Sequence, residues 1–230
     1  VGLMALQDAA YDSRLASPLD VLCAESQGMI GYMIAQELQN ALNGARSVAV
    51  MVTRVEVDPK DPAFKSPSKP IGPLYSQREA AALAASHGWT IMADGEHFRR
   101  AVASPQPVRI LEIDTIRHLA GSAAITICAG GGGIPVVRGA AGSFSGIEAI
   151  IDKDHASRMV ACETQASAFL MLTDVDGLYL GWGTKDRQML RRATPAELRR
   201  HSFARGTMAP KVEAAIEFVT RGGHMAGIGK

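Results

Sequence analysis

The chain has 230 residues, of which 47% are hydrophobic and 20% charged, and its formal net charge is +1. This length supports one large α/β domain, or one domain that carries a small insertion. The near-zero net charge argues against nucleic acid or an acidic membrane as a main partner. The three cysteines, Cys23, Cys128 and Cys162, are widely spaced and form no CxxC pair. They support neither a disulfide framework nor a zinc site, and they favour a reducing cytoplasm.

The first part of the chain predicts a helix followed by a strand. Apolar residues recur at helical spacing over 18–42, and Pro18 suits an early helix position. Asn43-Gly44 is typical of a helix end. The β-branched and apolar segment 47–57 then predicts a strand.

A polar, proline-rich segment, 58–73, follows this strand. Each proline removes a backbone donor, so the segment cannot continue a helix or join a central strand. We expect a stiff excursion from the main sheet. A short helix and two strands are predicted after it, over 77–86, 89–92 and 98–102. We interpret residues 58–107 as a small inserted subdomain within a domain that spans 1–230.

The remainder alternates helices with apolar strands. Helices are predicted over 112–120, 154–163 and 210–220, and strands over 123–129, 169–173 and 225–228. Such alternation predicts an α/β fold with a mostly parallel sheet that is covered on both faces. Ligands in these folds bind beyond the carboxyl ends of the strands. The uncharged stretch 119–137 is long enough to span a membrane, but its glycines and proline indicate a strand and a loop.

Four consecutive glycines, Gly130, Gly131, Gly132 and Gly133, follow the apolar run 123–129. Without a Cβ, their backbone N–H groups can approach a ligand closely, and converging amide dipoles suit a phosphate or a carboxylate. The alternative is a flexible turn.

Lysine is scarce, with seven residues against seventeen arginines, so each lysine is informative. Lys211 lies near the start of the predicted helix 210–220, where the helix dipole disfavours a cation by up to about 1 kcal/mol and a bound anion would reverse that sign. Lys69 lies between prolines on a stiff loop, which suits delivery of a charge across a cleft. The alternative for both is an exposed surface lysine.

Lys153 and Asp154 are predicted at the carboxyl edge of the sheet, after the two isoleucines that we expect to end a strand. Asp154 suits the N-cap of the next helix, and a carboxylate there can hold two lysines in a fixed geometry. The alternative is a simple cap beside a solvated lysine. We interpret His155 as a helix-surface residue and not as a base.

An apolar strand leads directly into Thr173-Asp174-Val175-Asp176-Gly177. This segment offers polar groups at the sheet edge, with Tyr179 and Trp182 close enough in sequence to flank a purine. The alternative is a turn that only ends the strand, because Asp and Gly suit turns well.

Taken together, these segments resemble the carbamate kinases, a branch of the amino acid kinase family, over essentially the whole chain. The similarity rests on Ser17–Leu22, Glu25–Tyr32, Val55–Asp58, Asp61–Phe64, Lys69–Pro73, Gly130–Val137, Ile151–Asp154, Thr173–Asp176 and Met208–Lys211. The proline-rich insertion and the glycine loop are the most specific of these motifs, whereas the Thr-Asp-Val-Asp-Gly element is shared across the wider family.

The resemblance implies a three-layer αβα sandwich with a protruding subdomain, usually a homodimer. It implies reversible phosphoryl transfer between ATP and carbamate, giving ADP and carbamoyl phosphate, with Mg²⁺ and often in arginine breakdown. By that likeness, Lys153 and Lys211 contact the transferring phosphoryl group, Asp154 orients them, Lys69 reaches in from the subdomain, and the Gly130–Gly133 loop lies against carbamate or phosphate. The residues implied to border the nucleotide are Thr173, Asp174, Tyr179, Met208 and Pro210.

Carbamate kinases have a strand with a Gly-Gly-Asn loop, and a second strand with a Gly-Asn-Gly-Pro-Gln-type loop, before the Val-Gly-Leu that opens this chain. We therefore expect that the N-terminal strands are missing from this sequence. Two alternatives stay open. One is a truncated, nucleotide-binding or inactive remnant, and the other is a related kinase that acts on another carboxylate or on a nucleotide.

Overall fold

The computed structural model describes residue 2 and residues 17–204 and 207–230. The chain divides into two compact units, unit 1 (Val1–Ala156) and unit 2 (Ser157–Lys230). Each unit is described by itself.

Within the described residues of unit 1, helix α2 (Leu19–Leu42) confirms the predicted helix over 18–42. The helix begins directly after Pro18 and ends at Asn43, which adopts a left-handed conformation with φ of 46°. Asn is one of the few residues apart from glycine that adopts this conformation readily, so the Asn-Gly pair ends the helix as expected.

The segment 47–57 forms two strands, so the prediction of a single strand was wrong. β1 (Val48–Val50) pairs in parallel with β7 (Ile125–Ile127), whereas β2 (Arg54–Val57) belongs to a separate sheet with the order β6-β2-β8-β9. The other strands of that sheet are β6 (Pro107–Ile110), β8 (Ile134–Arg138) and β9 (Phe144–Gly146). The break occurs at Thr53, whose backbone N–H and C=O both bond the side chain of Gln27.

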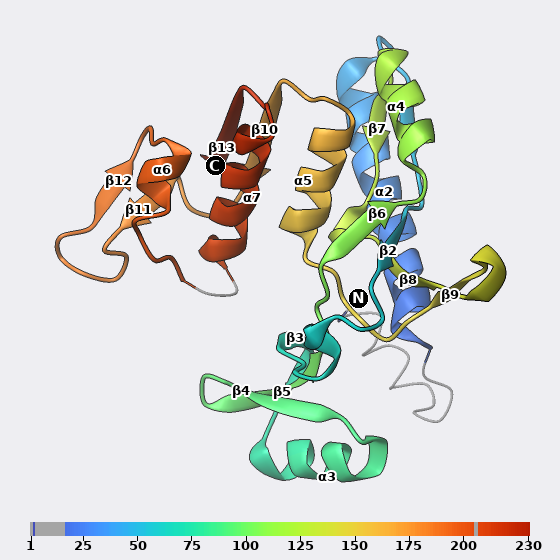
Figure 1. Cartoon of the computed structure of the whole chain (residues 1–230), viewed down its shortest axis with the longest axis vertical. Helices are drawn as coiled ribbons and strands as arrows, with labels where there is room; N and C mark the ends of the chain where they lie inside the picture. The colour runs from blue at the N-terminus through green and yellow to red at the C-terminus, as the bar shows by residue number, and fades with distance from the viewer. Residues whose placement is uncertain (1, 3–16, 205–206) are drawn as a thin grey trace. The chain divides into compact units, whose positions relative to one another are not determined.

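A three-stranded antiparallel sheet lies within the range predicted for the inserted subdomain. Its order is β3-β5-β4, from β3 (Lys69–Tyr75), β4 (Thr90–Asp94) and β5 (His97–Val102). Helix α3 (Gln77–His87) lies along one side of this sheet (Figure 1) and begins with a capping box made by Ser76 and Glu79. The prolines of β3 lie on an edge strand, where a missing backbone donor is tolerated. The extent of the subdomain, 58–107, stays a prediction.

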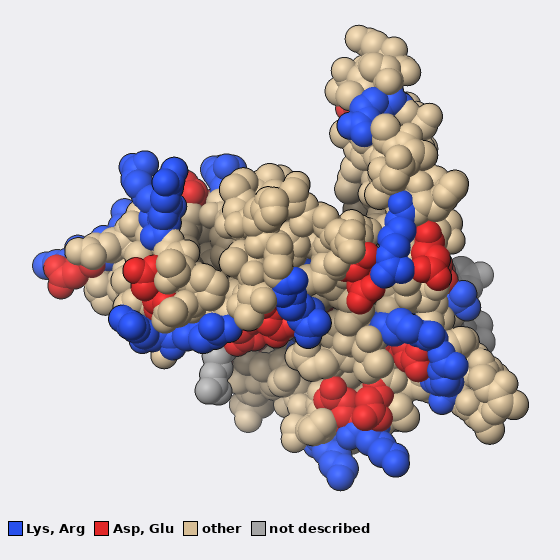
Figure 2. All heavy atoms as spheres, turned by 45° about the horizontal axis from the view of Figure 1, so that its top comes forward, with Lys and Arg blue, Asp and Glu red and all other residues tan. Residues whose placement is uncertain are grey.

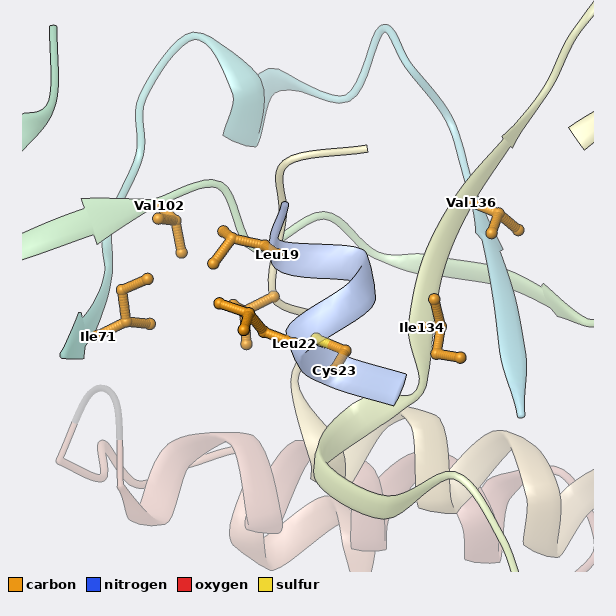
Figure 3. Packing of buried hydrophobic residues seen from close by; sticks show 8 residues of the cluster. Leu19, Leu22, Cys23, Ile71, Val102, Ile134 and Val136 are labelled. Carbon is orange, nitrogen blue, oxygen red and sulfur yellow. The ribbon is translucent and has the colours of Figure 1, made fainter. Parts of the chain in front are cut away.

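The main core of unit 1 joins the base of this sheet to the strands of the four-stranded sheet. Leu19, Leu22 and Cys23 on the first turns of α2 lie between Ile71 and Val102 on one side and Ile134 and Val136 on the other (Figure 3). Burial of each large aliphatic side chain contributes about 1.5–3 kcal/mol. Apolar packing thus fixes the start of β3 and the end of β5.

The remaining helices of unit 1 match their predicted ranges within one or two residues. Helix α4 (Ile113–Gly121) precedes β7, and helix α5 (Lys153–Glu163) begins in unit 1 and continues into unit 2. The apolar run before the glycines forms only a short strand, β7. The 3₁₀ turns are η2 (Pro62–Phe64), η3 (Gly130–Gly132) and η4 (Ala140–Gly142).

Unit 2 pairs β10 (Ala168–Leu172) in parallel with β13 (Met225–Gly229). Phe169 and Met171 on β10 pack against Ala214, Ala215 and Phe218 on helix α7 (Met208–Thr220). A second, antiparallel pair is formed by β11 (Leu178–Leu180) and β12 (Gln188–Leu190), followed by the short helix α6 (Pro195–Leu198). The predicted strand, helix and final strand are confirmed as β10, α7 and β13, but the segment between β10 and α7, which we expected to be irregular, contains β11, β12 and α6.

The predicted α/β class is confirmed. The pairs β1 with β7, β2 with β8, and β10 with β13 are all parallel, which requires crossover connections between their strands. On the face shown in Figure 2, basic and acidic side chains lie side by side in most places, in line with the small net charge. Among the helices within the described ranges, none has the length and apolar character needed to cross a membrane.

Candidate active site

Two of the four loop glycines are required by packing. Gly132 has φ of 103°, and a Cβ there would overlap the carbonyl oxygen of Ile151. Gly133 has φ of 89°, and a Cβ there would overlap the side chain of Val55. Both residues are buried. The loop therefore lies directly against the segment that leads into helix α5.

The other two glycines are available to a ligand. Gly131 is exposed, has φ of 69°, and has open space where a Cβ would point. The N–H groups of Gly132 and Gly133 donate to Ala129 and Gly130 carbonyls at 3.0 and 3.5 Å. The N–H groups of Gly130 and Gly131 donate to no group among the described residues. This is the main-chain arrangement that suits an anion.

A buried polar cluster fixes the loop to helix α2. Thr53 donates its backbone N–H to Gln27 Oε1 at 2.9 Å, and Gln27 Nε2 donates to the Thr53 carbonyl at 3.1 Å. The Thr53 hydroxyl donates to the Met51 carbonyl at 3.0 Å and accepts the Ala129 N–H at 2.9 Å. Gln27 and Thr53 are almost fully buried. Such satisfied networks give a segment one defined position.

The start of helix α5 is capped by Asp152. The Asp154 N–H donates to Asp152 Oδ1 at 2.9 Å, and the helix begins at Lys153. The prediction of Asp154 as N-cap was therefore wrong by two positions, and Asp154 lies buried in the first turn. A carboxylate there is favoured by the helix dipole. The expectation that Ile150-Ile151 ends a strand was also wrong, since the backbone there makes only an isolated bridge between Ala103 and Ala149.

Two lysines lie at this helix start. Lys153 Nζ is 4.0 Å from Asp154 Oδ2, and its side chain is 63% exposed. Lys69, at the first position of β3, places its Nζ 2.6 Å from Asp152 Oδ2. Lys69 is therefore an ion-paired residue and not a solvated one, which removes the alternative of a simple exposed lysine.

The pKa of Asp152 lies below its usual value. Burial acts to raise it, but the hydrogen bond and charge of Lys69 outweigh that effect, aided by the Asp154 N–H and the charge of His155. Asp152 is thus held as a carboxylate, the form that can bind both a lysine and a helix amide.

Lys211 lies in unit 2, as the fourth residue of α7, and only 7% of it is exposed. The alternative of a surface lysine is wrong. The N–H groups of Met208 and Ala209 both donate to the Ala204 carbonyl, at 3.2 and 3.0 Å, and Pro210 has no N–H. The Met208 and Ala209 amides at the helix start are therefore already bonded within the chain.

The polar turn after β10 also lies in unit 2. The Thr173 N–H donates to the Gly229 carbonyl at 2.9 Å, and the Thr173 hydroxyl donates to Asp174 at 3.1 Å. Tyr179 packs against Trp182 with ring centroids 5.3 Å apart, and the Arg187 guanidinium lies 6.0 Å from the Tyr179 ring. Flat side chains of this kind can stack on a nucleobase.

Sequence reasoning missed several residues of this region. His155 was interpreted as a surface residue, but it is buried. Asp152 was missed, although an Asp-x-Asp pair before a helix was a signal for its capping role. Gln27 and Thr53 carried no local signal because they are 26 residues apart.

Burial raises the pKa of the Cys23 thiol to about 11 and also raises the pKa of the Cys128 thiol, so both thiols remain protonated.

The structure groups the expected residues into one set in each unit. Unit 1 holds Lys69, Lys153, Asp154 and the Gly130–Gly133 loop, which are linked through Asp152 and the Ile151 carbonyl. Unit 2 holds Thr173, Asp174, Tyr179, Met208, Pro210 and Lys211. Within the described parts of both units, no three His, Cys, Asp or Glu side chains lie close enough to hold a metal ion.

Comparison with known proteins adds a family assignment. A model of the amino acid kinase family matches residues 20–229. A protein of Rhizobium meliloti (strain 1021) called carbamate kinase is 46% identical over 231 residues, which cover all of this chain and 71% of the relative. A carbamate kinase of Escherichia coli (strain K12) is 47% identical over 229 residues, covering all of this chain and 75% of the relative.

Solved structures agree with these relatives. A protein of Aeropyrum pernix K1 superimposes with a TM-score of 0.92 and 38% identity, covering all of this chain and 76% of that protein. A carbamate kinase from Giardia lamblia bound to AMP-PNP superimposes with a TM-score of 0.88 and 36% identity, covering all of this chain and 75% of that protein.

Proposed function

The chain belongs to the amino acid kinase family and, within it, to the carbamate kinases, and we propose that it transfers a phosphoryl group reversibly between ATP and carbamate, giving ADP and carbamoyl phosphate. The observation that carries this proposal is the 46% identity to a carbamate kinase over the whole of this chain. In unit 1, Lys69, which pairs with Asp152, and the neighbouring glycine loop supply the positive charge and the amide donors that a phosphate needs.

The reaction joins two anions, so charge neutralisation and in-line positioning matter more than acid–base catalysis. A carbamate oxygen attacks the γ-phosphorus of ATP while the bond from that phosphorus to the ADP oxygen breaks. Lys153 and Lys211 neutralise the transferring phosphoryl group, and Asp154 orients these lysines. Because carbamate is already an anionic nucleophile, no residue is needed as a general base.

The glycine loop and Lys69 serve the smaller substrate. The N–H groups of Gly130 and Gly131 bind carbamate or the phosphate of carbamoyl phosphate, since the other two loop amides are used within the loop. Lys69, the first residue of β3, adds an ammonium group. Preorganised donors of this kind stabilise charge that develops in the transition state.

The nucleotide is bordered by residues of unit 2, namely Thr173, Asp174, Tyr179, Met208 and Pro210. AMP-PNP is an ATP analogue, and its presence in the similar Giardia lamblia carbamate kinase supports an ATP or ADP site. Mg²⁺ enters with the nucleotide as part of the substrate, because nucleotide-bound Mg²⁺ needs few protein ligands.

The same proposal extends to a cytoplasmic homodimer that acts in arginine breakdown and forms ATP from carbamoyl phosphate. The cysteines support a reducing compartment, since Cys23, Cys128 and Cys162 are all free thiols. The dimer is checked by the mass of the protein in solution, measured by light scattering.

Formation of ATP from ADP tests the proposed reaction. The purified protein is incubated with Mg²⁺, ADP and either carbamoyl phosphate or acetyl phosphate, and ATP is measured. We expect ATP with carbamoyl phosphate and little with acetyl phosphate. Equal rates with both would favour a related acyl-phosphate kinase instead. ADP binding without turnover, together with an intact mass near 24.3 kDa, would favour an inactive remnant.

A further inference from the structure

One carboxylate in unit 1 makes two contacts that link distant parts of the chain. Asp152 Oδ2 accepts from Lys69 Nζ at 2.6 Å, across 83 residues of sequence. Asp152 Oδ1 accepts from the Asp154 N–H at 2.9 Å. The side chains are 16% and 30% exposed for Asp152 and Lys69, so the pair is partly shielded from water. Charge-assisted contacts of this length are stronger than neutral ones.

Lys69 is the first residue of β3, at one end of the β3-β5-β4 sheet. It pairs with Val102 at the end of β5, and the neighbouring Ser68 N–H donates to the Val102 carbonyl at 3.2 Å. The backbone of Lys69 is thus held at the end of the sheet where Ile71 and Val102 are buried. Its side chain extends from that sheet to Asp152.

Asp152 lies where the glycine loop meets helix α5. The preceding carbonyl, that of Ile151, packs on Gly132, and the following residues are Lys153 and Asp154. A shift of Asp152 would therefore move the Lys69 ammonium and the first turn of α5 together.

We infer that Asp152 is a positioning residue for phosphoryl transfer: it holds the Lys69 ammonium beside the start of helix α5 and releases it to the incoming phosphate-bearing substrate. This inference rests on the proposed function. The carboxylate limits the conformations that the long lysine side chain can adopt, so less entropy is lost when the ammonium is aligned with the transferring phosphoryl group in the transition state. A dianionic phosphate then competes with Asp152 for the same ammonium.

A neighbouring ion pair provides a matched control. Arg100 Nη2 on β5 lies 3.0 Å from Glu148 Oε2, so this pair also joins the β3–β5 sheet to the segment before α5. Glu148 Oε1 accepts the Leu19 N–H at 2.8 Å, and a glutamine could keep that bond. Glu148 has no role in the proposed chemistry. Glu148→Gln therefore removes one ionic link of the same kind without touching Lys69.

Asp152→Asn keeps the size of the side chain and an oxygen that can cap α5, but it removes the charge that holds Lys69. We expect kcat for ATP formation to fall about 10- to 100-fold, because small misplacements of a reacting group cost rates of this order. The KM for carbamoyl phosphate should stay the same or fall, since the competing carboxylate is gone. A merely structural defect would instead raise KM and lower Tm.

A double-mutant cycle separates action through Lys69 from any other effect. We expect Asp152→Asn to change kcat less than about twofold in a Lys69→Ala background, and Glu148→Gln to leave kcat unchanged in the wild-type background. If Asp152→Asn does not fold, Asp152→Ser replaces it in the cycle, because serine also caps helices.

Three results would overturn the inference while the wild type forms ATP: an unchanged kcat in Asp152→Asn, a full additional loss in the Lys69→Ala background, or an equal loss in Glu148→Gln. A wild type that forms no ATP from carbamoyl phosphate would instead contradict the proposed function. The two failures are therefore distinguishable in one experiment.

Discussion

Helices α5 and α7 each begin with a lysine that the proposed reaction requires, but the two helix starts differ. Lys153 is the first residue of α5, and its side chain is 63% exposed. Lys211 is the fourth residue of α7 and is only 7% exposed. At the start of α5 the Asp154 amide is capped by the Asp152 carboxylate, whereas the first two amides of α7 are capped by the main-chain carbonyl of Ala204.

This difference separates a lysine that is positioned by folding from one that is positioned by its ligand. Burial of an ammonium group costs folding free energy, but a buried side chain loses little further entropy when a substrate binds. An exposed lysine costs nothing in folding and must be ordered during binding. We therefore expect Lys211 to matter more for turnover and Lys153 to matter less for it.

The largest effect is expected for Lys211→Met. Loss of one preorganised donor lowers kcat by about 10²–10³-fold in comparable sites. Because methionine fills similar space, the fold should be kept and the loss should lie in kcat. Steady-state ATP formation and thermal unfolding of the same preparation check both parts.

Lys153→Met is the matched variant for this comparison. Its side chain is mostly exposed, so the free energy of unfolding should change by no more than the usual small effect of a surface substitution, about 0.5 kcal/mol. We expect a loss of kcat several-fold smaller than that of Lys211→Met. Equal losses in the two variants would remove the distinction between the two helix starts.

The two sides of the glycine loop provide the next comparison, now in stability. Gly132→Ala combines a left-handed backbone with an overlap on the Ile151 carbonyl, and should cost about 2–5 kcal/mol of unfolding free energy. Gly131→Ala meets open space and should cost only about 1–2 kcal/mol from its backbone conformation. Urea unfolding measures both, and a Gly131→Ala cost as large as that of Gly132→Ala would contradict the packing argument.

The smallest expected effect is a change of the unfolding free energy at low pH. The pKa of Asp152 is lowered in the folded protein, so its stabilising contribution is present above the unfolded pKa of about 3.9 and is lost as pH falls through the folded value. The wild type should exceed Asp152→Asn in unfolding free energy near neutral pH, and the gap should close below about pH 4. A gap that is constant from neutral pH to acid would contradict the ion pair.

Much of the fold could be predicted because its signals are local. The end of α2 at Asn43-Gly44, the capping by prolines and polar residues, and the apolar spacing of the helices are all contained in short windows. The break between β1 and β2 could not be predicted, because valines recur from 48 to 57 and no glycine or proline interrupts them. It depends on Gln27, a side chain from another element.

The site residues were recognised by type, but their environments were not. The burial of Lys211 had a signal, since Ala214, Ala215 and Phe218 lie three, four and seven positions after it and form one buried helix face. The exchange of Asp154 for Asp152 as the cap falls within the usual uncertainty of a helix boundary. The Lys69 pair with Asp152 joins residues 83 apart and has no local pattern.

The central claim is that Lys153 and Lys211 act on the same phosphoryl group, and a kinetic cycle tests it most directly. The kcat for ATP formation from carbamoyl phosphate and ADP is measured for the wild type, Lys153→Met, Lys211→Met and the double variant. We predict that the double variant loses much less activity than the product of the two single losses, as groups that act as a unit do. A double loss equal to that product would mean that the two lysines act independently, and would contradict the claim.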